Sequence, residues 1–441
     1  MADIHPFRGV RWNQHLVKDL SRVICSPSDI ITPKLQRELY RRSEYNFVRL
    51  DACLESADDK YEDSKWQRAA GTMENWLDKG ILQIDKVPAI YLHDHYFTYL
   101  GKEYMRRGII AIVRLEDWDR MIIRRHENIL PELKKARLSQ IRTMKANTSP
   151  LLALFRDQRG LMSSLSSVEK LGRPIISLSS NTSDRHNIWS ITEPKLIGQI
   201  CSSLAEEPLY MADGHHRYES ALTLQAERHA SCPSASRDDA FNFVMMTLSS
   251  VSDSGLIVRP FHRLVRGIPE SVLTELLTGL KTFFEVEEWL LDMPYVWQKV
   301  DSLLASRDPD KPDEVTLVLF GLASDKLFVL RLRDFAPVID VMPASQSEAY
   351  KRLDVSIADQ IIIGKLLQIT DDKREKLLAF SNERPDAVKK VLRHEYQLAL
   401  LVRAPTIEQI INIADSGTTM PEKSTRFYPK APTGFVFYRL V

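Results

Sequence analysis

The sequence predicts a mixed α/β protein, and three observations support that fold class. Short apolar runs bounded by polar residues, as at 109–113 and 241–248, are typical of buried strands. Apolar residues recur at helical spacing in other stretches, for example at 57–79. At 208–222 an apolar run, an Asp-Gly pair and a helical pattern follow one another, which indicates a strand, a tight turn and a helix.

The composition is that of a globular protein with two or three domains. Of its 441 residues 44% are hydrophobic and 27% charged, and the net charge is +1. This balance argues against nucleic acid or an anionic membrane as partner. No apolar run reaches the ~18 residues of a membrane span, and no leader is evident. Scattered cysteines without C-x-x-C spacing favour a reducing compartment, so the cytoplasm is the expected location: Cys25, Cys53, Cys201 and Cys232.

An N-terminal α/β region is expected at 1–268. Its predicted elements, in order, are a strand at 46–51, a helix at 57–79, strands at 89–100 and 109–113, a helix entered at Pro131, a loop-rich stretch at 171–200, the strand–turn–helix at 208–222, and strands at 241–248 and 257–265. His93 and His95 share one side of the strand at 89–100; surface histidines are the favoured interpretation, and a catalytic pair is the alternative.

A C-terminal α+β region is expected at 269–441. The pattern predicts helices at 269–305, a hairpin from 315–319 and 327–332, and further helices near 345–370 and 385–402. The region ends in a Pro-braced loop at 420–434. Lys423, Ser424, Thr425 and Lys430 of this loop are candidate ligands for a substrate or a distal phosphate; a plain terminal loop before an edge strand is the alternative.

The junction at 213–217 is the strongest candidate site. Free N–H groups and the positive end of the dipole at a helix start favour an anion. Gly214 lets the backbone approach a ligand, Asp213 can cap the helix, and Arg217 suits phosphate oxygens. With His215 and His216 these residues predict a phosphate cradle for a nucleotide; the alternative is an ordinary junction with two surface histidines. Adjacent helical histidines point about 100° apart, so no metal site is expected.

His126 and Glu127 precede the helix entered at Pro131, in a connection of the kind that often presents catalytic side chains. A glutamate beside a histidine can act as a general base, although an exposed polar pair is the alternative. The chain has no Walker A loop, no dinucleotide fingerprint and no kinase catalytic loop. A nucleotide would therefore be bound by other means.

The chain resembles the bacterial and archaeal family known as domain of unknown function 1015. One departure stands out, because Ser28 follows Pro27 where the family usually has tyrosine. The family name carries no activity. The matching pieces run from end to end in family order: Pro6–Gly9, Asn46–Leu50, Arg114–Glu116, His126–Glu127, Ala212–Tyr218, His262–Leu264, Leu353–Val355, Met420–Thr425 and Phe427–Lys430.

The motif at 213–217 also resembles the helix start of the ParB/sulfiredoxin superfamily, which includes kinases of free serine. This resemblance implies a ParB/sulfiredoxin-like nucleotide-binding core with an insertion around 150–200. In those kinases the motif binds nucleotide phosphates, and the glutamate of an upstream His-Glu pair activates the serine hydroxyl. His215 stands where sulfiredoxins have a reactive cysteine, which argues against sulfinic-acid reduction. Neutral charge and the lack of an evident helix-turn-helix argue against chromosome partitioning.

The expected function is nucleotide-dependent phosphoryl transfer to a small hydroxyl metabolite, with free serine as one candidate. Glu127 would be the base, oriented by His126, and both would face the same hollow as residues 213–217. The expected cofactor is Mg²⁺ with ATP or ADP, Asp213 capping the helix or holding the ion through water. The alternatives are a phosphatase or nucleotide hydrolase with a histidine nucleophile or acid, and a non-catalytic nucleotide sensor.

Overall fold

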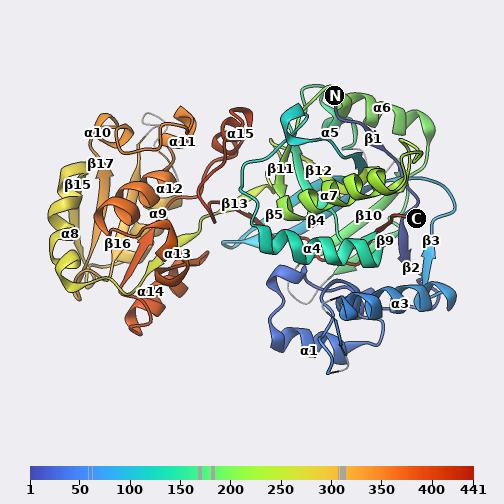
Figure 1. Ribbon diagram of the computed structural model, residues 1–441, viewed down its shortest axis with the longest axis horizontal. Helices are drawn as coiled ribbons and strands as arrows, with labels where there is room; N and C mark the ends of the chain where they lie inside the picture. Colours follow the sequence, from blue (N-terminus) through green and yellow to red (C-terminus); the bar gives the residue numbers. More distant parts are fainter. Residues whose placement is uncertain (58, 62, 167–170, 180–183, 306, 308–313) are drawn as a thin grey trace. The chain divides into compact units, whose positions relative to one another are not determined.

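The computed structural model describes residues 1–57, 59–61, 63–166, 171–179, 184–305, 307 and 314–441 (Figure 1). These residues form two compact units: Met1–Arg125, Ile129–Ile257 and Pro429–Val441 make the first, and His126–Asn128 and Val258–Tyr428 the second. Both units mix helices with strands, which confirms the predicted mixed α/β class. The main crossing between the units falls after residue 257. The short segment His126–Asn128 belongs to the second unit, and the C-terminal segment Pro429–Val441 belongs to the first.

A nine-stranded sheet is the frame of the first unit among the described residues. Its strands run in the order β6-β11-β8-β12-β5-β4-β10-β9, with β1 paired to β5. The bounds are β1 (Ile4–His5), β4 (Ile90–Tyr99), β5 (Lys102–Arg114), β6 (Ile123–Arg124), β8 (Leu151–Phe155), β9 (Ile176–Ser179), β10 (Arg185–Ile191), β11 (Leu209–Asp213) and β12 (Phe243–Ser250). Short pairs complete the unit: β2 (Val10–Trp12) with β3 (Leu82–Ile84), and β7 (Ala146–Asn147) with β21 (Tyr438–Arg439).

The segment 109–113 of β5 is a continuous apolar run because the sheet is covered on both faces there. Along β5, Ile110 and Ile112 enter one hydrophobic cluster, while Ile109 and Val113 enter another. Side chains of a strand alternate between faces, so burial on both sides produces a continuous apolar run. The predicted strands at 109–113 and 241–248 are confirmed, the latter as β12 between β5 and β8.

Helices cover this sheet. The bounds are η1 (Leu20–Arg22), η2 (Ser28–Ile30), α1 (Pro33–Arg42), α2 (Val48–Asp51), α3 (Ser64–Asp78), η3 (Trp118–Arg120), α4 (Pro131–Met144), α5 (Leu161–Ser164), α6 (Pro194–Ala205), α7 (His215–Ser231) and η5 (Ala240–Asn242). Figure 1 shows α4 and α7 side by side, and the two helices are in contact. Tyr218 and Ala221 of α7 pack into one of the two clusters that line the sheet.

Three predictions for the first unit are wrong. Residues 48–51 are helical rather than extended, and the side chain of Asn46 accepts from the backbone N–H of Val48 at the start of that turn. The stretch 171–200 contains β9, β10 and the start of α6, with 180–183 outside the described residues; polar residues in these strands conceal their pattern. His93 and His95 of β4 are buried, at 5% and 1% exposure, and their rings pack against His186 of β10, with Phe435 also against His93.

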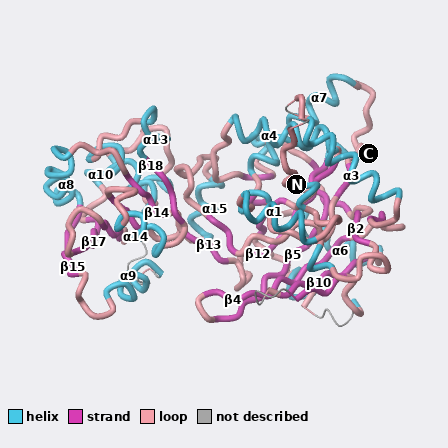
Figure 2. Tube along the Cα trace, turned by 90° about the horizontal axis from the view of Figure 1, so that it is seen from below, coloured by secondary structure: helices cyan, strands magenta, loops and turns pink. Residues whose placement is uncertain are grey.

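The second unit is built on a six-stranded sheet in the order β15-β17-β16-β19-β14-β18 among its described residues. The strands of this sheet, magenta in Figure 2, are β14 (His262–Val265), β15 (Phe284–Leu290), β16 (Thr316–Phe320), β17 (Lys326–Leu332), β18 (Leu378–Ser381) and β19 (Leu398–Leu401). A separate pair is formed by β13 (Ile257–Arg259) and β20 (Arg426–Tyr428). Its helices are α8 (Glu270–Phe283), α9 (Val296–Ala305), α10 (Ala336–Ile339), α11 (Glu348–Lys351), α12 (Asp354–Ile357), the π-helical η6 (Ala358–Leu366), α13 (Asp371–Leu377), α14 (Arg384–Leu392) and α15 (Ile407–Asp415).

The α+β character of this region and its β16–β17 hairpin agree with the sequence pattern. Two predicted helices are interrupted by strands. β15 divides 269–305, and β19 occupies the end of 385–402. Val300 of α9 and Ala387 of α14 pack with Val318 of β16 in one cluster, so these apolar segments are held by contacts distant in sequence.

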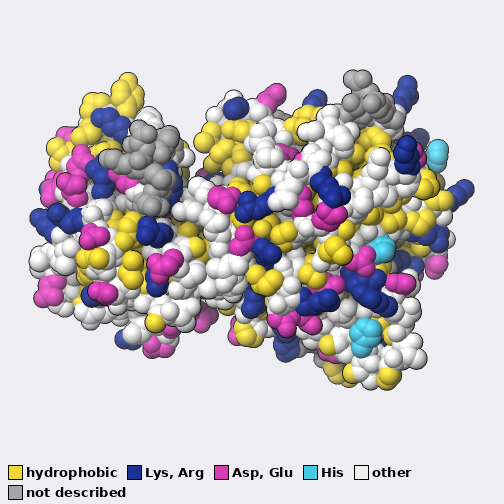
Figure 3. All heavy atoms as spheres, turned by 90° about the horizontal axis from the view of Figure 1, so that it is seen from above, with side chains coloured by type: hydrophobic (Ala, Val, Ile, Leu, Met, Phe, Trp, Pro, Cys, Tyr) yellow, Lys and Arg dark blue, Asp and Glu magenta, His cyan; other side chains and the backbone are white. Residues whose placement is uncertain are grey.

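Acidic and basic side chains are interspersed on the face drawn in Figure 3, as the near-neutral net charge suggests. Within the described residues, each helix is too short or too polar to cross a membrane.

Candidate functional site

The predicted strand–turn–helix is confirmed at the end of β11. β11 ends at Asp213, Gly214 adopts φ 99°, and α7 begins at His215. The register of β11 against β8 shifts between Met211 and Asp213, an irregularity of the kind that often re-aims a side chain beside a site. A Cβ on Gly214 would lie 2.9 Å from Leu151 Cγ and 2.9 Å from Arg217 Nη2. Backbone conformation and space therefore both require glycine here.

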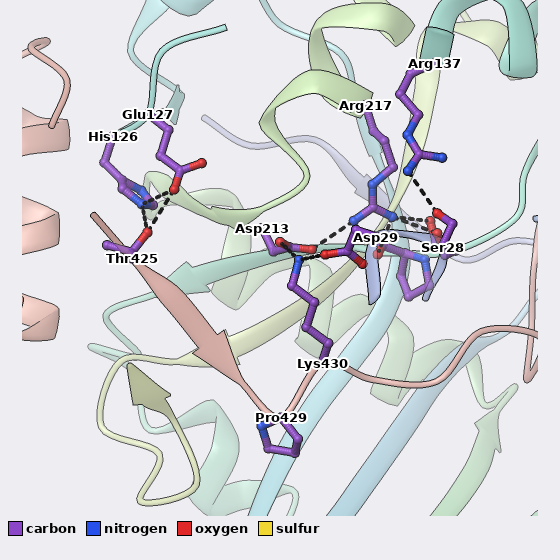
Figure 4. A network of polar contacts seen from close by, with 12 residues as sticks. Ser28, Asp29, His126, Glu127, Arg137, Asp213, Arg217, Thr425, Pro429 and Lys430 are labelled. Atoms are coloured by element: carbon purple, nitrogen blue, oxygen red, sulfur yellow. Dashed lines mark hydrogen bonds and ion pairs between the residues drawn. The ribbon is translucent and has the colours of Figure 1, made fainter. Parts of the chain in front are cut away.

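The N-cap position of α7 is Gly214 rather than Asp213. The Asp213 carboxylate accepts from Lys430 Nζ at 2.7 Å and from Arg217 Nη2 at 3.0 Å (Figure 4). Burial would raise the pKa of Asp213, but the charges of Lys430 and Arg217 outweigh it and hold the pKa well below its usual value. The carboxylate therefore stays ionised at neutral pH. Lys430 also donates to Asp29 Oδ2 at 2.5 Å.

Arg217 joins the helix start to the loop before β8. Its Nη1 donates to Ser149 Oγ at 2.7 Å and to the carbonyl oxygens of Ser149 and Pro150 at 3.3 and 3.2 Å. Arg137 of α4 donates to Ser28 Oγ at 2.9 Å. Arg137 and Arg217 both line a cavity of about 40 Å³. A cavity of this size holds water rather than a nucleotide, so a nucleotide at this junction would lie outside it.

The two adjacent histidines have different surroundings. His215 is 2% exposed and lies near enough to Asp213 to contribute to lowering its pKa. His216 is partly exposed, and its Nε2 accepts from the backbone N–H of Leu130, three residues after Glu127, at 3.0 Å. Their predicted role in binding phosphate stays a prediction.

His126 and Glu127 lie in the second unit and share a partner. Thr425 Oγ1 donates to Glu127 Oε1 at 3.0 Å and lies 2.9 Å from His126 Nε2 (Figure 4). With Thr425 donating to the carboxylate, His126 Nε2–H donates to Thr425. Thr425 thus links the two side chains, whose own N···O separation is 4.0 Å. The Glu127 side chain is 29% exposed, so it can accept a proton from outside.

The four candidate residues of the terminal loop are distributed over the two units. Lys430 belongs to the first unit, whereas Lys423, Ser424 and Thr425 belong to the second. Ser424 is fully buried and donates to the carbonyl of Pro421 at 2.6 Å, which leaves it a structural role. Lys423 is exposed. Glu127 and the junction at 213–217 also belong to different units, so the hollow that they are expected to share stays a prediction.

Four residues around the junction are not predicted as site residues from the sequence: Asp29, Arg106, Arg137 and Ser149. Asp29 directly follows Ser28, the position at which this chain departs from the family pattern. Arg106 is 6% exposed and donates to the carbonyl of Pro429, beside Lys430, at 2.8 Å. Burial lowers the pKa of Arg106 to about 10, against the nearby charges of Asp253 and Asp213. Nothing in its surrounding sequence distinguishes Arg106 from a surface arginine.

The fold and this junction define a mixed α/β protein with a charged strand-to-helix turn. The chain belongs to the family described as protein of unknown function (DUF1015), which matches residues 4–356. The family resemblance found in the sequence is thereby confirmed, and the loop at 420–430 lies beyond the matched residues. No curated protein matches the chain.

Several solved structures are loosely similar. A conserved hypothetical protein from Pyrococcus furiosus has 14% identity and a TM-score of 0.36, over 75% of this chain and 95% of that one. A free serine kinase in complex with AMP has the same identity and TM-score, over 72% and 86%. SbnI from Staphylococcus aureus, truncated at its C-terminus, has 10% identity and a TM-score of 0.35, over 72% and 82%. At these TM-scores the similarity says nothing about the activity of this chain.

Proposed function

We propose that this chain is a nucleotide-dependent phosphotransferase that acts on the hydroxyl group of a small metabolite. The observation that carries the proposal is the start of α7, a 17-residue helix whose N-cap is the left-handed Gly214 and beside which Arg217 and Lys430 bring positive charge to Asp213. Free serine is one candidate acceptor.

The helix start supplies the chemistry that phosphate oxygens need. The first-turn N–H groups of a long helix donate to anions, and the dipole favours negative charge there. Arg217 offers further donors from the first turn, and Lys430 brings an ammonium group to the same carboxylate, Asp213. Gly214 allows a close approach of the backbone. A nucleotide would place its phosphates at this point.

Glu127 is the proposed base. In the reaction with ATP, a bond forms between the acceptor oxygen and the γ-phosphorus, and the bond from this phosphorus to the bridging oxygen breaks. The hydroxyl proton passes to the Glu127 carboxylate, and ADP leaves. With ADP as donor, the β-phosphoryl group moves and AMP leaves. Thr425 and His126 would hold the carboxylate in one orientation through their hydrogen bonds.

Asp213 fits a role in holding Mg²⁺ through water, since its carboxylate is ionised and partly exposed. The ion would neutralise charge on the transferring phosphates. Lys430 competes for the same carboxylate, so ion binding would require Lys430 to turn toward phosphate oxygens instead.

The alternative of a hydrolase with a histidine nucleophile has less support. His215 is buried, and Nε2 of His216 already accepts from Leu130. An attacking imidazole needs an exposed nitrogen lone pair. The other alternative is a non-catalytic nucleotide sensor. A sensor would bind nucleotide without turnover, whereas a phosphotransferase would bind it and form a phosphorylated product.

The first experiment measures nucleotide binding. Calorimetric titration with ATP, ADP, CTP and GTP in the presence of Mg²⁺ should give binding to the wild-type chain. Arg217→Ala should weaken it about 10- to 100-fold, as expected for the loss of a charge-assisted hydrogen bond. Arg228→Ala, an exposed position at the other end of α7, should bind as the wild type does. Equal affinity in the wild type and Arg217→Ala, with both folded, would refute the proposed cradle.

A further inference from the structure

A cluster of three buried histidines is formed by residues that are not part of the proposed phosphate site. His93 and His95 alternate along β4 and therefore share a face of the sheet, and His186 of the neighbouring β10 is the register partner of His95. Figure 1 shows the two strands β4 and β10. The ring centroids of His95 and His186 are 4.1 Å apart, and those of His93 and His186 5.3 Å. All three side chains are at most 5% exposed. This is an unusual concentration of polar rings within a packed sheet.

A carboxylate joins the cluster from the segment before β10. Asp184 Oδ2 lies 3.6 Å from His95 Nε2, and its side chain is 30% exposed. One donor atom each from His95, His186 and Asp184 can be chosen so that all three lie within 4.8 Å of one another. Two imidazole nitrogens and one carboxylate oxygen at this spacing could converge on one ion with small side-chain shifts.

His95 is the residue that ordinary packing does not explain. Its side chain is 1% exposed, yet within the part of the chain that the structure describes neither ring nitrogen has a hydrogen-bond partner. Buried polar atoms are nearly always satisfied, and an exception calls for an explanation such as an ion or a water. Asp184 is close to Nε2 but beyond hydrogen-bond distance.

A neighbouring ring holds one imidazole of the cluster in place. His93 Nε2 lies 3.1 Å from His186 Nδ1, so a hydrogen bond fixes the orientation of the His186 ring. Metal-ligating histidines are commonly held in this way by a partner on their other nitrogen.

We propose that His95, His186 and Asp184 bind a divalent transition-metal ion such as Zn²⁺, with His93 as the positioning residue behind His186. Nitrogen ligands with a single carboxylate suit zinc and its neighbours rather than Mg²⁺ or Ca²⁺, which prefer oxygen. Three protein ligands leave a fourth position for solvent. The site is independent of the proposed phosphotransfer, because none of these residues belongs to the junction at 213–217.

The positive charge of Arg106 opposes the binding of a cation at this site. Arg106 is the register partner of His95 on β5, so its positive charge is near the proposed ion. It donates to the carbonyl of Pro429, and Asp253 offsets part of its charge. The negative charge of Asp184 is consequently essential to the site. Asp184→Asn, which keeps the size of a partly exposed side chain, is the sharpest variant.

The test uses the full chain purified without a histidine tag and stripped of metal by a chelator. Titration with Zn²⁺ against a chromophoric competitor should show one strong site per chain, and Zn²⁺ should raise the melting temperature. Co²⁺ should give the visible absorption of a tetrahedral site. Asp184→Asn should bind Zn²⁺ at least about 10-fold more weakly, and His95→Ala more weakly still. His15→Ala, an exposed histidine, should bind as the wild type does.

Either of two results overturns the proposal: a wild-type chain that takes up no Zn²⁺ at a stoichiometric site, or an Asp184→Asn variant with unchanged affinity. If His95→Ala fails to fold, Asp184→Asn and the wild-type titration decide the question. Weak binding that His15→Ala reduces as much as Asp184→Asn also counts against the site, because it marks scattered surface imidazoles.

Discussion

At the scale of single residues, the cradle depends on Asp213 being ionised. Its pKa is depressed mainly because the positive charges of Lys430 and Arg217 outweigh the effect of burial. A depressed folded-state pKa contributes stability that is fully present above the unfolded value, about 3.9, and is lost as the pH falls toward the folded value. The contribution is therefore constant at neutral pH and declines only in acid.

Asp213→Asn should for this reason lower the free energy of unfolding at pH 7, and the difference from the wild type should shrink below about pH 4. Urea unfolding at a series of pH values measures it. Asp78→Asn, at the exposed end of α3, should show a smaller difference at pH 7. A difference between wild type and Asp213→Asn that grows as the pH falls would contradict the assigned ion pairs.

The residues of the junction could be found in the sequence because their chemistry is local. A glycine, a helix start and an arginine within five positions indicate an anion site without any knowledge of the fold. The partners of these residues could not be found. Asp29 reaches Asp213 only through Lys430, 401 positions further along the chain. Contacts at such separation depend on the topology, and the sequence pattern carries no trace of them.

At the scale of elements, the turn between β11 and α7 has a strict requirement. Gly214→Ala would place a Cβ against Leu151 and Arg217 in a left-handed conformation, and should destabilise the first unit by about 1–3 kcal/mol. The matched control is Gly71→Ala inside α3, where a Cβ meets nothing within 4 Å. That change should stabilise by about 0.5–1 kcal/mol. Thermal melting of both variants gives the comparison, and a neutral Gly214→Ala would contradict the assigned geometry.

Elements with strong periodicity were predictable, and those set by distant partners were not. The helix at α3 and the strand at β12 follow from their own apolar spacing. The sequence of β15 continues the apolar pattern of α8 and therefore predicts a helix. Its pairing with β17 makes this segment a strand instead. The burial of the histidines of β4 is not predictable from their own strand, because the neighbouring strand, β10, lies in a stretch with too little pattern to be recognised.

At the scale of the whole molecule, the proposed function needs both units. The junction at 213–217 lies in the first, while Glu127, with Thr425 and His126, lies in the second. In the sequence, the chain passes from one unit to the other on either side of 126–128 and again after residue 428. The sequence showed the two motifs but not this division, because it is a property of tertiary contacts.

The most direct test of the proposed phosphoryl transfer compares Glu127→Gln with the wild type. Transfer of labelled phosphate from ATP, and then from ADP, is measured against serine and a panel of small hydroxyl compounds, alongside nucleotide affinity. Glu127→Gln should lose roughly 100-fold or more of the turnover while nucleotide affinity is kept. Glu132→Gln, an exposed change in the first turn of α4, should keep both. Full turnover in Glu127→Gln, or a wild-type chain that binds nucleotide and transfers nothing, would contradict the account.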